Sequence, residues 1–403
     1  FSNLPEAKQT VDIQPMEQFN QGWGAILYRT TLPEVTAAGT TLKITEVHDW
    51  AQIYADGKLL ARLDRRKGEF TTTLPALKKG TQLDILVEAM GRVNFDKSIH
   101  DRKGITEKVE LISGNQTKEL KNWTVYNFPV DYSFIKDKKY NDTKIVPTMP
   151  AYYKSTFNLD KVGDTFLDMS TWGKGMVWVN GHAMGRFWEI GPQQTLFMPG
   201  CWLKEGENEI LVLDLKGPVK ASIKGLKKPI LDVLREKAPE THRKDGEKLK
   251  LTGEKVVHEG AFTPGNGWQE VRFATPVKGR YFCLEALSPQ ANDNIAAIAE
   301  FDVLGADGKP VSREHWKIRY ADSEETRSGN RTADKIFDLQ ESTFWMTVDN
   351  VPYPHQLVID LSKVETVTGF RYLPRAEKEY PGMIREYRIF IKKEDFDYGK
   401  VVL

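Results

Sequence analysis

Residues 171–218 read TWGKGMVWVNGHAMGRFWEIGPQQTLFMPGCWLKEGENEILVLDLKGP, and this stretch decides the fold class. Met176–Asn180 and Glu209–Leu213 are short runs rich in apolar residues, a pattern typical of strands. Asn180-Gly181 is the strongest short-range signal for a β-hairpin, and residues 203–206, LKEG, indicate a second turn. The stretch therefore predicts an all-β module.

The run from Trp172 to Leu196 resembles the galactose-binding-like sandwich of family 35 glycoside hydrolases, the β-galactosidases. Residues 21–30, QGWGAILYRT, resemble the strand by which the family's chain leaves its catalytic barrel and enters its sandwiches. The resemblance implies the accessory region of a retaining enzyme that acts on terminal β-galactosides. The family's barrel, which carries both catalytic glutamates, has no counterpart here. We therefore expect no catalytic residues and no activity from this chain alone, and we expect the barrel of the same enzyme as its partner.

Composition limits the other classes of function. At 403 residues the chain suits two to four domains. The 57 basic and 56 acidic residues nearly cancel, which argues against a nucleic-acid partner. No apolar run approaches the length of a membrane span, so we expect no membrane insertion. Cys201 and Cys283 are the only cysteines and suggest neither a disulfide framework nor a zinc site. The resemblance leads us to expect a periplasmic or secreted protein.

An internal repeat indicates two copies of one jelly-roll-like unit. Trp50, residues 52–57 and residues 77–80 recur as Trp172, residues 176–181 and residues 203–206, at an offset between 122 and 126 residues. Residues 224–254 are rich in Lys, Glu and Pro and lack periodicity, apart from one or two helical turns expected near residues 229–237. The predicted organisation is a lead-in segment (1–20), two galactose-binding-like β-sandwiches (21–130 and 131–223), a linker (224–254) and a discoidin-like β-sandwich (255–403).

The assignment of the last domain depends on a second resemblance. Residues 316–392 are similar to about half of a discoidin-type module, the coagulation factor V/VIII type C fold, notably in Tyr320–Glu325, Pro354–Leu361 and Gly369–Arg375. Residues 260–303 resemble the strands that normally end such a module, yet they precede its beginning. We hypothesise a circularly permuted domain, because ends that lie close together make permutation cheap. The alternative is a truncated module followed by an incomplete one.

Aromatic and planar side chains in the opening stretch suggest an interface. The stretch holds more aromatic residues than the core of one small sandwich needs. Sugars stack on exposed rings, so a lectin-like site is one interpretation, but the resemblance favours packing against the barrel. The predicted interface residues are Trp172, Arg186, Trp188 and Gln193.

In the discoidin-like region, five residues are candidates for a carbohydrate site. Arg371 and Arg375 flank Tyr372, and planar donors beside an aromatic face could hold a galactose-containing glycan. Trp345 and His355 lie in neighbouring predicted loops. The alternative is that Tyr372 packs in the core and that the arginines pair with nearby acids.

Carbohydrate-binding modules of this fold often hold a structural calcium ion, and we expect no other cofactor. The resemblance places the ligands at Glu300, Asp338 and Thr343. A glycine and one charged ligand of the family's loop are replaced by Leu339 and Gln340. Because calcium prefers several oxygen ligands with net negative charge, the losses weaken the case for a filled site.

Three interpretations remain open at this point. The first is the accessory region of a β-galactosidase-like enzyme, and the second is a stand-alone carbohydrate-binding or adhesion protein. The third is a structural module that meets another copy of the protein. A large exposed apolar face around Trp188 would favour the first, and polar loops with one aromatic groove would favour the second.

Overall fold

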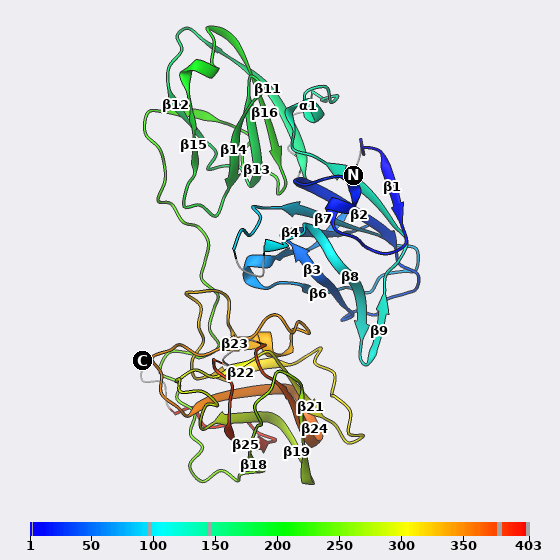
Figure 1. Cartoon of the computed structure of the whole chain (residues 1–403), viewed down its shortest axis with the longest axis vertical. Helices are drawn as coiled ribbons and strands as arrows, with labels where there is room; N and C mark the ends of the chain where they lie inside the picture. The colour runs from blue at the N-terminus through cyan, green and yellow to red at the C-terminus, as the bar shows by residue number, and fades with distance from the viewer. Residues whose placement is uncertain (2, 96–98, 143–146, 148, 377–380, 400–403) are drawn as a thin grey trace. The chain divides into compact units, whose positions relative to one another are not determined.

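The computed structural model describes residues 1–403 apart from 2, 96–98, 143–146, 148, 377–380 and 400–403. Strands dominate the chain and are joined by turns and a few short helices, so the all-β expectation is confirmed (Figure 1). The chain divides into two compact units, one of residues 1–127 and 238–403 and the other of residues 128–237. Among the described residues, no helix has the length and apolar character that a membrane span requires.

The first sandwich contains two antiparallel sheets. Six strands form one sheet in the order β1-β10-β2-β7-β4-β5, and four form the other in the order β6-β3-β8-β9. Inward and outward side chains alternate along β3, where Leu42 and Ile44 are fully buried between half-buried neighbours. The elements are β1 (Ala7–Thr10), η1 (Met16–Phe19), β2 (Gly24–Thr31), β3 (Thr41–His48), β4 (Trp50–Ala55), β5 (Lys58–Asp64), η2 (Arg65–Lys67), β6 (Thr71–Thr73), β7 (Gln82–Ala89), β8 (Gly104–Ser113), β9 (Gln116–Glu119) and β10 (Trp123–Phe128).

The second sandwich contains a four-stranded sheet, β11-β16-β13-β14, and a three-stranded sheet, β15-β12-β17. Asn180 and Gly181 both have positive φ, 48° and 85°, as a type I′ turn requires, and the predicted hairpin between β13 and β14 is confirmed. The elements are α1 (Tyr132–Ile135), β11 (Ala151–Leu159), β12 (Thr165–Asp168), β13 (Lys174–Val179), β14 (His182–Trp188), β15 (Thr195–Met198), η4 (Gly200–Trp202), β16 (Gly206–Asp214) and β17 (Lys224–Leu226).

The two sandwiches repeat the same strand order, which confirms the predicted internal repeat. Strands β2-β7-β4-β5 of the first copy recur as β11-β16-β13-β14 in the second. In the facing sheets, β6-β3-β8 recurs as β15-β12-β17. The first copy has three further strands: β10 and then β1 beyond β2 in one sheet, and β9 beyond β8 in the other.

The third sandwich brings both halves of the predicted discoidin-like module into one sheet, ordered β18-β25-β19-β24-β21 with β22 beside β24. β18 and β25, one from each half, are antiparallel neighbours. This pairing excludes two incomplete modules, and the permuted order itself stays a prediction. The elements are β18 (His258–Ala261), β19 (Gln269–Ala286), β20 (Ala297–Ile298), β21 (Glu300–Leu304), β22 (Lys317–Ala321), η5 (Ala333–Phe337), β23 (Trp345–Met346), β24 (His355–Leu373) and β25 (Glu386–Lys392).

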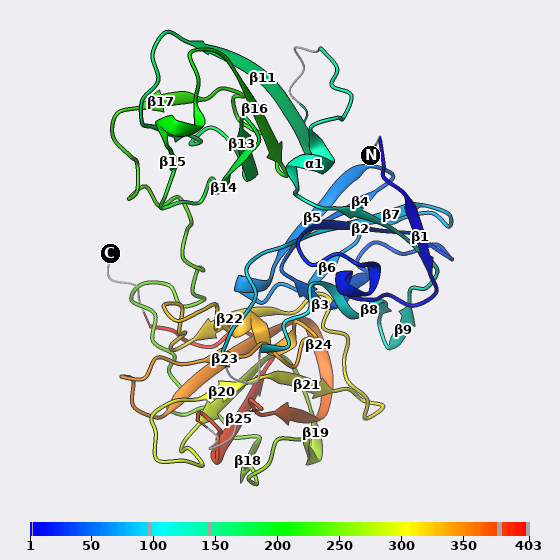
Figure 2. The same ribbon diagram turned by 45° about the horizontal axis from the view of Figure 1, so that its top comes forward.

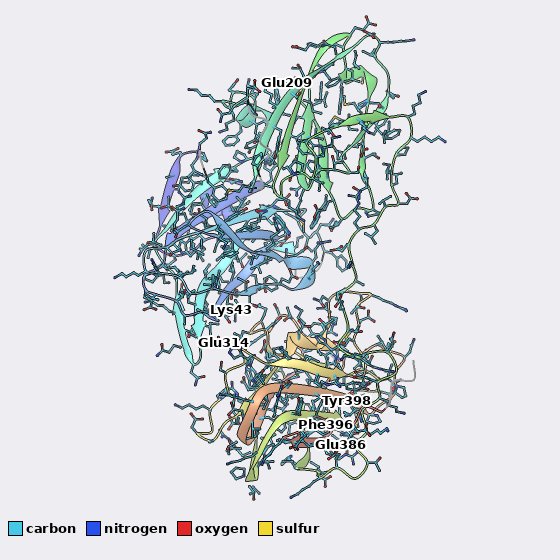
Figure 3. The ribbon with its side chains drawn as sticks, turned by 180° about the vertical axis from the view of Figure 1, so that it is seen from behind. Lys43, Glu209, Glu314, Glu386, Phe396 and Tyr398 are labelled. Carbon is cyan, nitrogen blue, oxygen red and sulfur yellow. The ribbon has the colours of Figure 1, made fainter. Side chains whose placement is uncertain are left out.

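The segment predicted as a linker is divided between the two units. β17 (Figure 2) belongs to the second sandwich, and residues 230–235 exchange backbone hydrogen bonds with residues 190–194. These bonds hold the segment in an extended form, so the helical turns expected near 229–237 do not occur. Further along, Leu249 packs with Phe396 and Tyr398 of the third sandwich, and the latter two are labelled in Figure 3.

Candidate functional site

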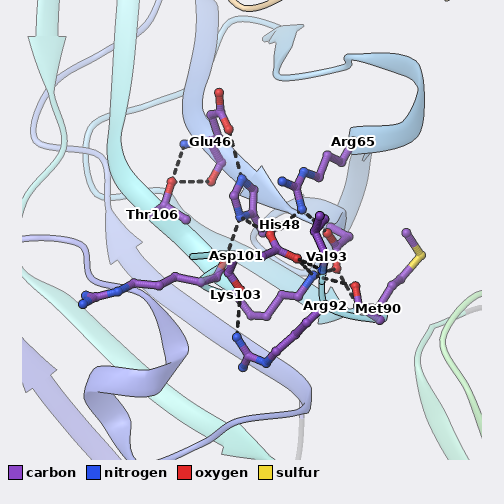
Figure 4. A network of polar contacts seen from close by, with 12 residues as sticks. Glu46, His48, Arg65, Met90, Arg92, Val93, Asp101, Lys103 and Thr106 are labelled. Atoms are coloured by element: carbon purple, nitrogen blue, oxygen red, sulfur yellow. Dashed lines mark hydrogen bonds and ion pairs between the residues drawn. The ribbon is translucent and has the colours of Figure 1, made fainter. Parts of the chain in front are cut away.

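A buried network of charged groups lies at one end of the first sandwich (Figure 4). Lys103 precedes β8, and its side chain is fully buried. Its Nζ lies 2.7 Å from Oδ2 of Asp49, between β3 and β4, and 2.8 Å from Oδ2 of Asp101. Arg65 reaches the same two carboxylates from the solvent side, at 2.8 Å and 2.7 Å. Two buried carboxylates thus face two cations, which makes the centre of the network neutral.

Electrostatics keep the Asp101 carboxylate ionised. Burial by itself would raise the pKa of Asp101, but hydrogen bonds from Lys103, the Val93 amide and Arg65 lower it to about 2. His48 Nδ1 lies 3.3 Å from Asp101, and its Nε2 lies 3.0 Å from Glu46. That hydrogen bond lowers the pKa of Glu46. Both aspartates are fully engaged by cations, so neither is placed to act as a general acid.

The network fixes the base of a surface loop that the structure describes at residues 90–95 and 99–101. Asp49 accepts a hydrogen bond from the Met90 amide at 2.6 Å, and Lys103 donates to the Gly91 carbonyl at 3.0 Å. Arg92 donates to the carbonyl oxygens of Asp101 and Gly22, each at 2.7 Å. These bonds tie the loop to the residues that precede β2.

The loop and its neighbour present large apolar side chains to solvent. Phe95 is 81% exposed, Ile99 60% and Val93 37%, while Trp23, next to the tethered Gly22, is 43% exposed. We call these four residues the apolar loop surface. Large apolar groups gathered on a firmly anchored base are typical of a docking surface for another protein part. The prediction from sequence missed this site, because the anchoring charges lie up to 54 residues apart and form no recognisable motif.

Three of the predicted carbohydrate-binding residues lie in the core of the third sandwich. Trp345 and Tyr372 are at most 1% exposed, and the Tyr372 ring stacks on Phe262 with centroids 4.1 Å apart. His355 is fully buried between Asp322, at 2.9 Å, and a backbone carbonyl. A ring without an open face offers a sugar nothing to stack on, so the structure corrects these three expectations to packing roles.

The two predicted arginines lie at the rim of the same module. Arg371 pairs with Asp302, and its guanidinium lies 4.6 Å from the centroid of the half-exposed Trp268 ring. Arg375 lies over the Phe344 ring at 4.3 Å. The structure therefore separates the arginines from the Tyr372 hydroxyl, and it places Arg371 beside an aromatic residue that was not predicted.

The predicted interface residues of the second sandwich differ in exposure. Trp172 is 4% exposed and belongs to the core, where its Nε1 donates to the Ser222 carbonyl. Trp188 is half-buried with Lys174 Nζ 4.2 Å from its ring centroid, whereas Arg186 and Gln193 are exposed. Exposed apolar residues occur on both units: the apolar loop surface lies on the first sandwich, and Leu231, Val233 and Leu234 lie in the segment that bonds to residues 190–194 of the second. An interface role for these four residues stays a prediction.

The predicted calcium ligands lie together, but the residues around them do not fit a calcium ion. Thr343 Oγ1 donates to Asp338, and Arg313 pairs with Glu300. Lys335 Nζ lies 3.8 Å from Asp338, so each carboxylate already faces a cation. Burial raises the pKa of Glu300 to about 8 and that of Asp338 to about 6. Among the described residues, no group of three or more His, Cys, Asp or Glu side chains could hold a metal ion.

A polar groove of about 760 Å³ lies on the third sandwich, between residues 248–256 and the face of β19, β24 and β25. Glu285 is at its centre, where it accepts from Gln356 at 3.0 Å and from Arg388 at 2.7 Å. Lys250 and Phe390 also line the groove. Converging polar groups on a concave surface can bind sugar hydroxyls, whereas the Phe390 ring is buried and has no open face for stacking.

Comparisons with known families agree with this architecture. The β-galactosidase first all-beta domain matches residues 14–129, and the β-galactosidase galactose-binding domain matches residues 150–208. The F5/8 type C domain matches residues 320–402.

Similar curated proteins include β-galactosidases and β-galactosidase-1-like proteins. Beta-galactosidase-1-like protein 2 of Homo sapiens is 34% identical over 205 residues, which are 49% of this chain and 30% of that protein. The β-galactosidase of Bos taurus is 34% identical over 255 residues, 55% of this chain and 37% of that protein. The β-galactosidase of Xanthomonas manihotis is 33% identical, over 49% of this chain and 32% of that protein. The chain thus spans about a third of these relatives, and it is made of accessory domains of the β-galactosidase family followed by an F5/8 type C domain.

Proposed function

We propose that this chain supports the catalytic barrel of a β-galactosidase-type glycoside hydrolase, and that the apolar loop surface is where the barrel docks. The observation that carries the proposal is the exposure of Phe95 and Ile99 on a loop anchored by a buried ion network. A bare surface of this kind is costly to leave in water, and covering it would stabilise the assembly. The hydrolysed bond would be a terminal β-galactoside, cleaved by the barrel.

The test uses the native protein with whatever sequence flanks these residues. Phe95→Ser combined with Ile99→Ser should shorten the half-life of aryl β-galactoside hydrolysis at elevated temperature by at least fivefold. Val35→Ser is the matched control, because Val35 is equally apolar and 70% exposed on the same sandwich. In the 403-residue chain alone, the double variant should leave the unfolding temperature unchanged.

Two results would overturn the proposal. Robust turnover by the 403-residue chain alone would mean that catalytic carboxylates lie within it. Equal half-lives for the double variant and for Val35→Ser would mean that no barrel rests on this surface. Cell fractionation of the native source tests the accompanying proposal that the protein is periplasmic or secreted.

A second candidate function is the binding of a galactose-containing glycan in the polar groove. The converging side chains of Glu285, Gln356 and Arg388 favour it. Calorimetric titration with galactose and galacto-oligosaccharides should give weak, saturable binding that Gln356→Ala reduces at least tenfold. Tyr372→Ala is not informative, since it opens the core. Binding that is absent in wild type, or unchanged in Gln356→Ala, would reject this groove.

We also propose that the F5/8 type C domain folds without calcium. Around the predicted site, the buried carboxylates of Glu300, Asp302 and Asp338 face three cations, Arg313, Arg371 and Lys335. Because each of these buried carboxylates already faces a built-in cation, the site attracts a calcium ion less strongly. Calorimetry in 1 mM EDTA and in 5 mM CaCl₂ should give the same unfolding temperature for this domain, and a rise of several degrees with calcium would reject the proposal.

A further inference from the structure

The internal repeat gives paired residues of β11, β16 and β13 counterparts in β2, β7 and β4 of the first sandwich. In the first copy Ile85 of β7 pairs with Tyr28 on one side and with Ile53 on the other. In the second copy Val212 of β16 occupies the same position. It pairs with two residues, one on each side: Tyr153 and Val177. Tyr153 of β11 is therefore the counterpart of Tyr28 of β2.

In the first copy, the outer edge of β2 is covered. β10 lies beside β2, and β1 lies beyond β10. Trp123 and Val125 of β10 are fully buried in the core, with the ring of Trp123 packed edge-on against Tyr28. The hydroxyl of Tyr28 donates to the Gln14 carbonyl at 2.8 Å. The neighbouring segments thus satisfy both the apolar face and the polar atoms of this edge.

In the second copy, no described strand pairs with the corresponding edge. β11 pairs with β16 on one side, and no backbone hydrogen bond joins its other side to a described residue. Every residue of β11 is half-buried or exposed, whereas β2 is buried along most of its length. The Tyr153 hydroxyl is buried without a hydrogen-bond partner, unlike that of Tyr28. An unpaired strand edge is a ready template for another strand.

A cavity of about 790 Å³ opens beside this edge, between β11 and the residues around β17. Its walls come from both sheets of the sandwich and are mostly apolar, including Phe157, Leu159, Leu167, Met198, Ile210 and Val212. The cavity lies on the side of the core where the first copy buries Trp123 and Val125. Its position and lining fit two or three large apolar side chains projecting from a strand beside β11.

We propose that the free edge of β11 is a docking site for one extended polypeptide strand with large apolar residues at alternate positions. A strand would both pair with the backbone groups of β11 and fill the cavity. A small apolar ligand would fill the cavity but leave the backbone groups unpaired. β10 is an example of such a strand, because Trp123 and Val125 alternate along it and are buried in the core of the first sandwich. The curated relatives contain about twice as much chain outside the matched region as within it, so proteins of this kind have polypeptide that could supply the strand. The inference goes beyond the proposed docking of a barrel and does not depend on it.

The probe is a peptide with the sequence of residues 119–129, ELKNWTVYNFP, labelled with a fluorophore and titrated into the 403-residue protein. In the first sandwich the chain holds β10 beside β2 at high effective concentration, so the peptide does not displace it. The edge that remains open to the peptide is that of β11. We expect saturable one-to-one binding, together with slower hydrogen exchange of the β11 amides. A peptide with serine in place of Trp123 and Val125 should bind at least tenfold more weakly.

Two further comparisons keep the proposal falsifiable. A peptide N-methylated at alternate amides cannot form the ladder, and it should lose at least tenfold in affinity. Phe157→Asp, at the half-buried cavity wall, should weaken binding similarly, with Phe197→Asp as the control because Phe197 is exposed and outside the cavity lining.

Equal binding of the methylated peptide would mean that the cavity takes apolar groups without strand pairing. A concentration-dependent dimer that Phe157→Asp abolishes would mean that a second copy occupies the edge, and no protection of β11 at millimolar peptide would reject the site. Each of these three results overturns the proposal.

Discussion

Replacing Lys103 by methionine should destabilise the first sandwich more than any other single charge removal in it. The side chain is fully buried, and its ammonium contacts Asp49, Asp101 and the carbonyl of Gly91. Methionine keeps most of the volume but leaves two buried carboxylates with Arg65 as the only close Lys or Arg partner among the described residues. One uncompensated buried charge costs about 3–5 kcal/mol. At about 3–4 °C per kcal/mol for a sandwich of this size, the unfolding temperature should fall by roughly 10–20 °C.

The penalty should depend on pH in a defined direction. In the wild type the pKa of Asp101 is lowered to about 2, so the stability that its pairing contributes is present above its ordinary pKa of 3.8 and is lost as pH falls toward 2. In Lys103→Met, Asp101 loses the hydrogen bond from Lys103 that lowers its pKa, so it gains a proton more readily and the buried charge is relieved. The difference between variant and wild type should therefore be largest at pH 7 and should shrink below about pH 4.

Calorimetry at pH 7 and pH 4 measures the effect, and hydrogen exchange in β7 and β8 assigns it to this sandwich. Lys108→Met is the matched control on β8, because Lys108 is half-exposed and forms a 3.6 Å surface pair that contributes little. Adding Asp101→Asn to Lys103→Met should recover part of the loss by removing one unpaired charge. If Lys103→Met unfolds within 2 °C of wild type at pH 7, the network does not hold the loop base and our reasoning fails.

Three other predictions follow from single contacts. Tyr28→Phe removes a buried hydroxyl that donates to the Gln14 carbonyl and should cost about 1–3 kcal/mol, whereas Tyr153→Phe removes a partnerless one and should be neutral or stabilising in the same unfolding assay. Gly181→Ala places a Cβ at φ 85° and 3.2 Å from a tyrosine ring carbon, and it should cost about 1–2 kcal/mol in calorimetry, while Gly163→Ala, with open space around it, should not. Because the pKa of Glu300 is raised to about 8 in the fold, its contribution to stability is full below pH 4.5 and is lost as pH rises toward 8. Glu300→Gln should flatten this decline of unfolding temperature with pH, and an unchanged decline would contradict the shift.

The sequence was most informative where structure is decided locally. Asn180 and Gly181 can adopt positive φ at low cost, so the hairpin between β13 and β14 followed from two residues. The repeat also followed, because its turns fall at nearly constant spacing in both copies. Tyr372 was misjudged because alternation along a strand tells which residues share a face, but not which face another layer covers. It lies in β24 between β19 and β21, so its ring faces the core while Arg371 faces outward.

Long-range polar contacts were outside the reach of sequence reasoning for a different reason. Asp49 and Lys103 are 54 residues apart and belong to no spacing motif, and each would be taken alone as a surface charge. Their burial becomes visible only when β4 and β8 are placed in facing sheets. The function of the network, which is to hold the loop, could not be predicted before that placement.

The described residues leave two apolar surfaces uncovered, the apolar loop surface and the cavity beside β11. They arise from opposite causes, so they can be tested independently. On the first copy both sheet edges next to β2 and β8 carry extra strands, and the exposed apolar residues lie on a loop held by ions. On the second copy the described residues form no such extra strands, and the apolar surface is part of the sandwich interior itself. Removing Phe95 takes away contact area without touching a core, whereas Phe157→Asp changes a cavity wall. Sites without shared partners contribute additively to stability. The loss of stability in a protein that carries both changes should therefore equal the sum of the losses in the two single variants. A loss larger than that sum would mean that one partner covers both surfaces.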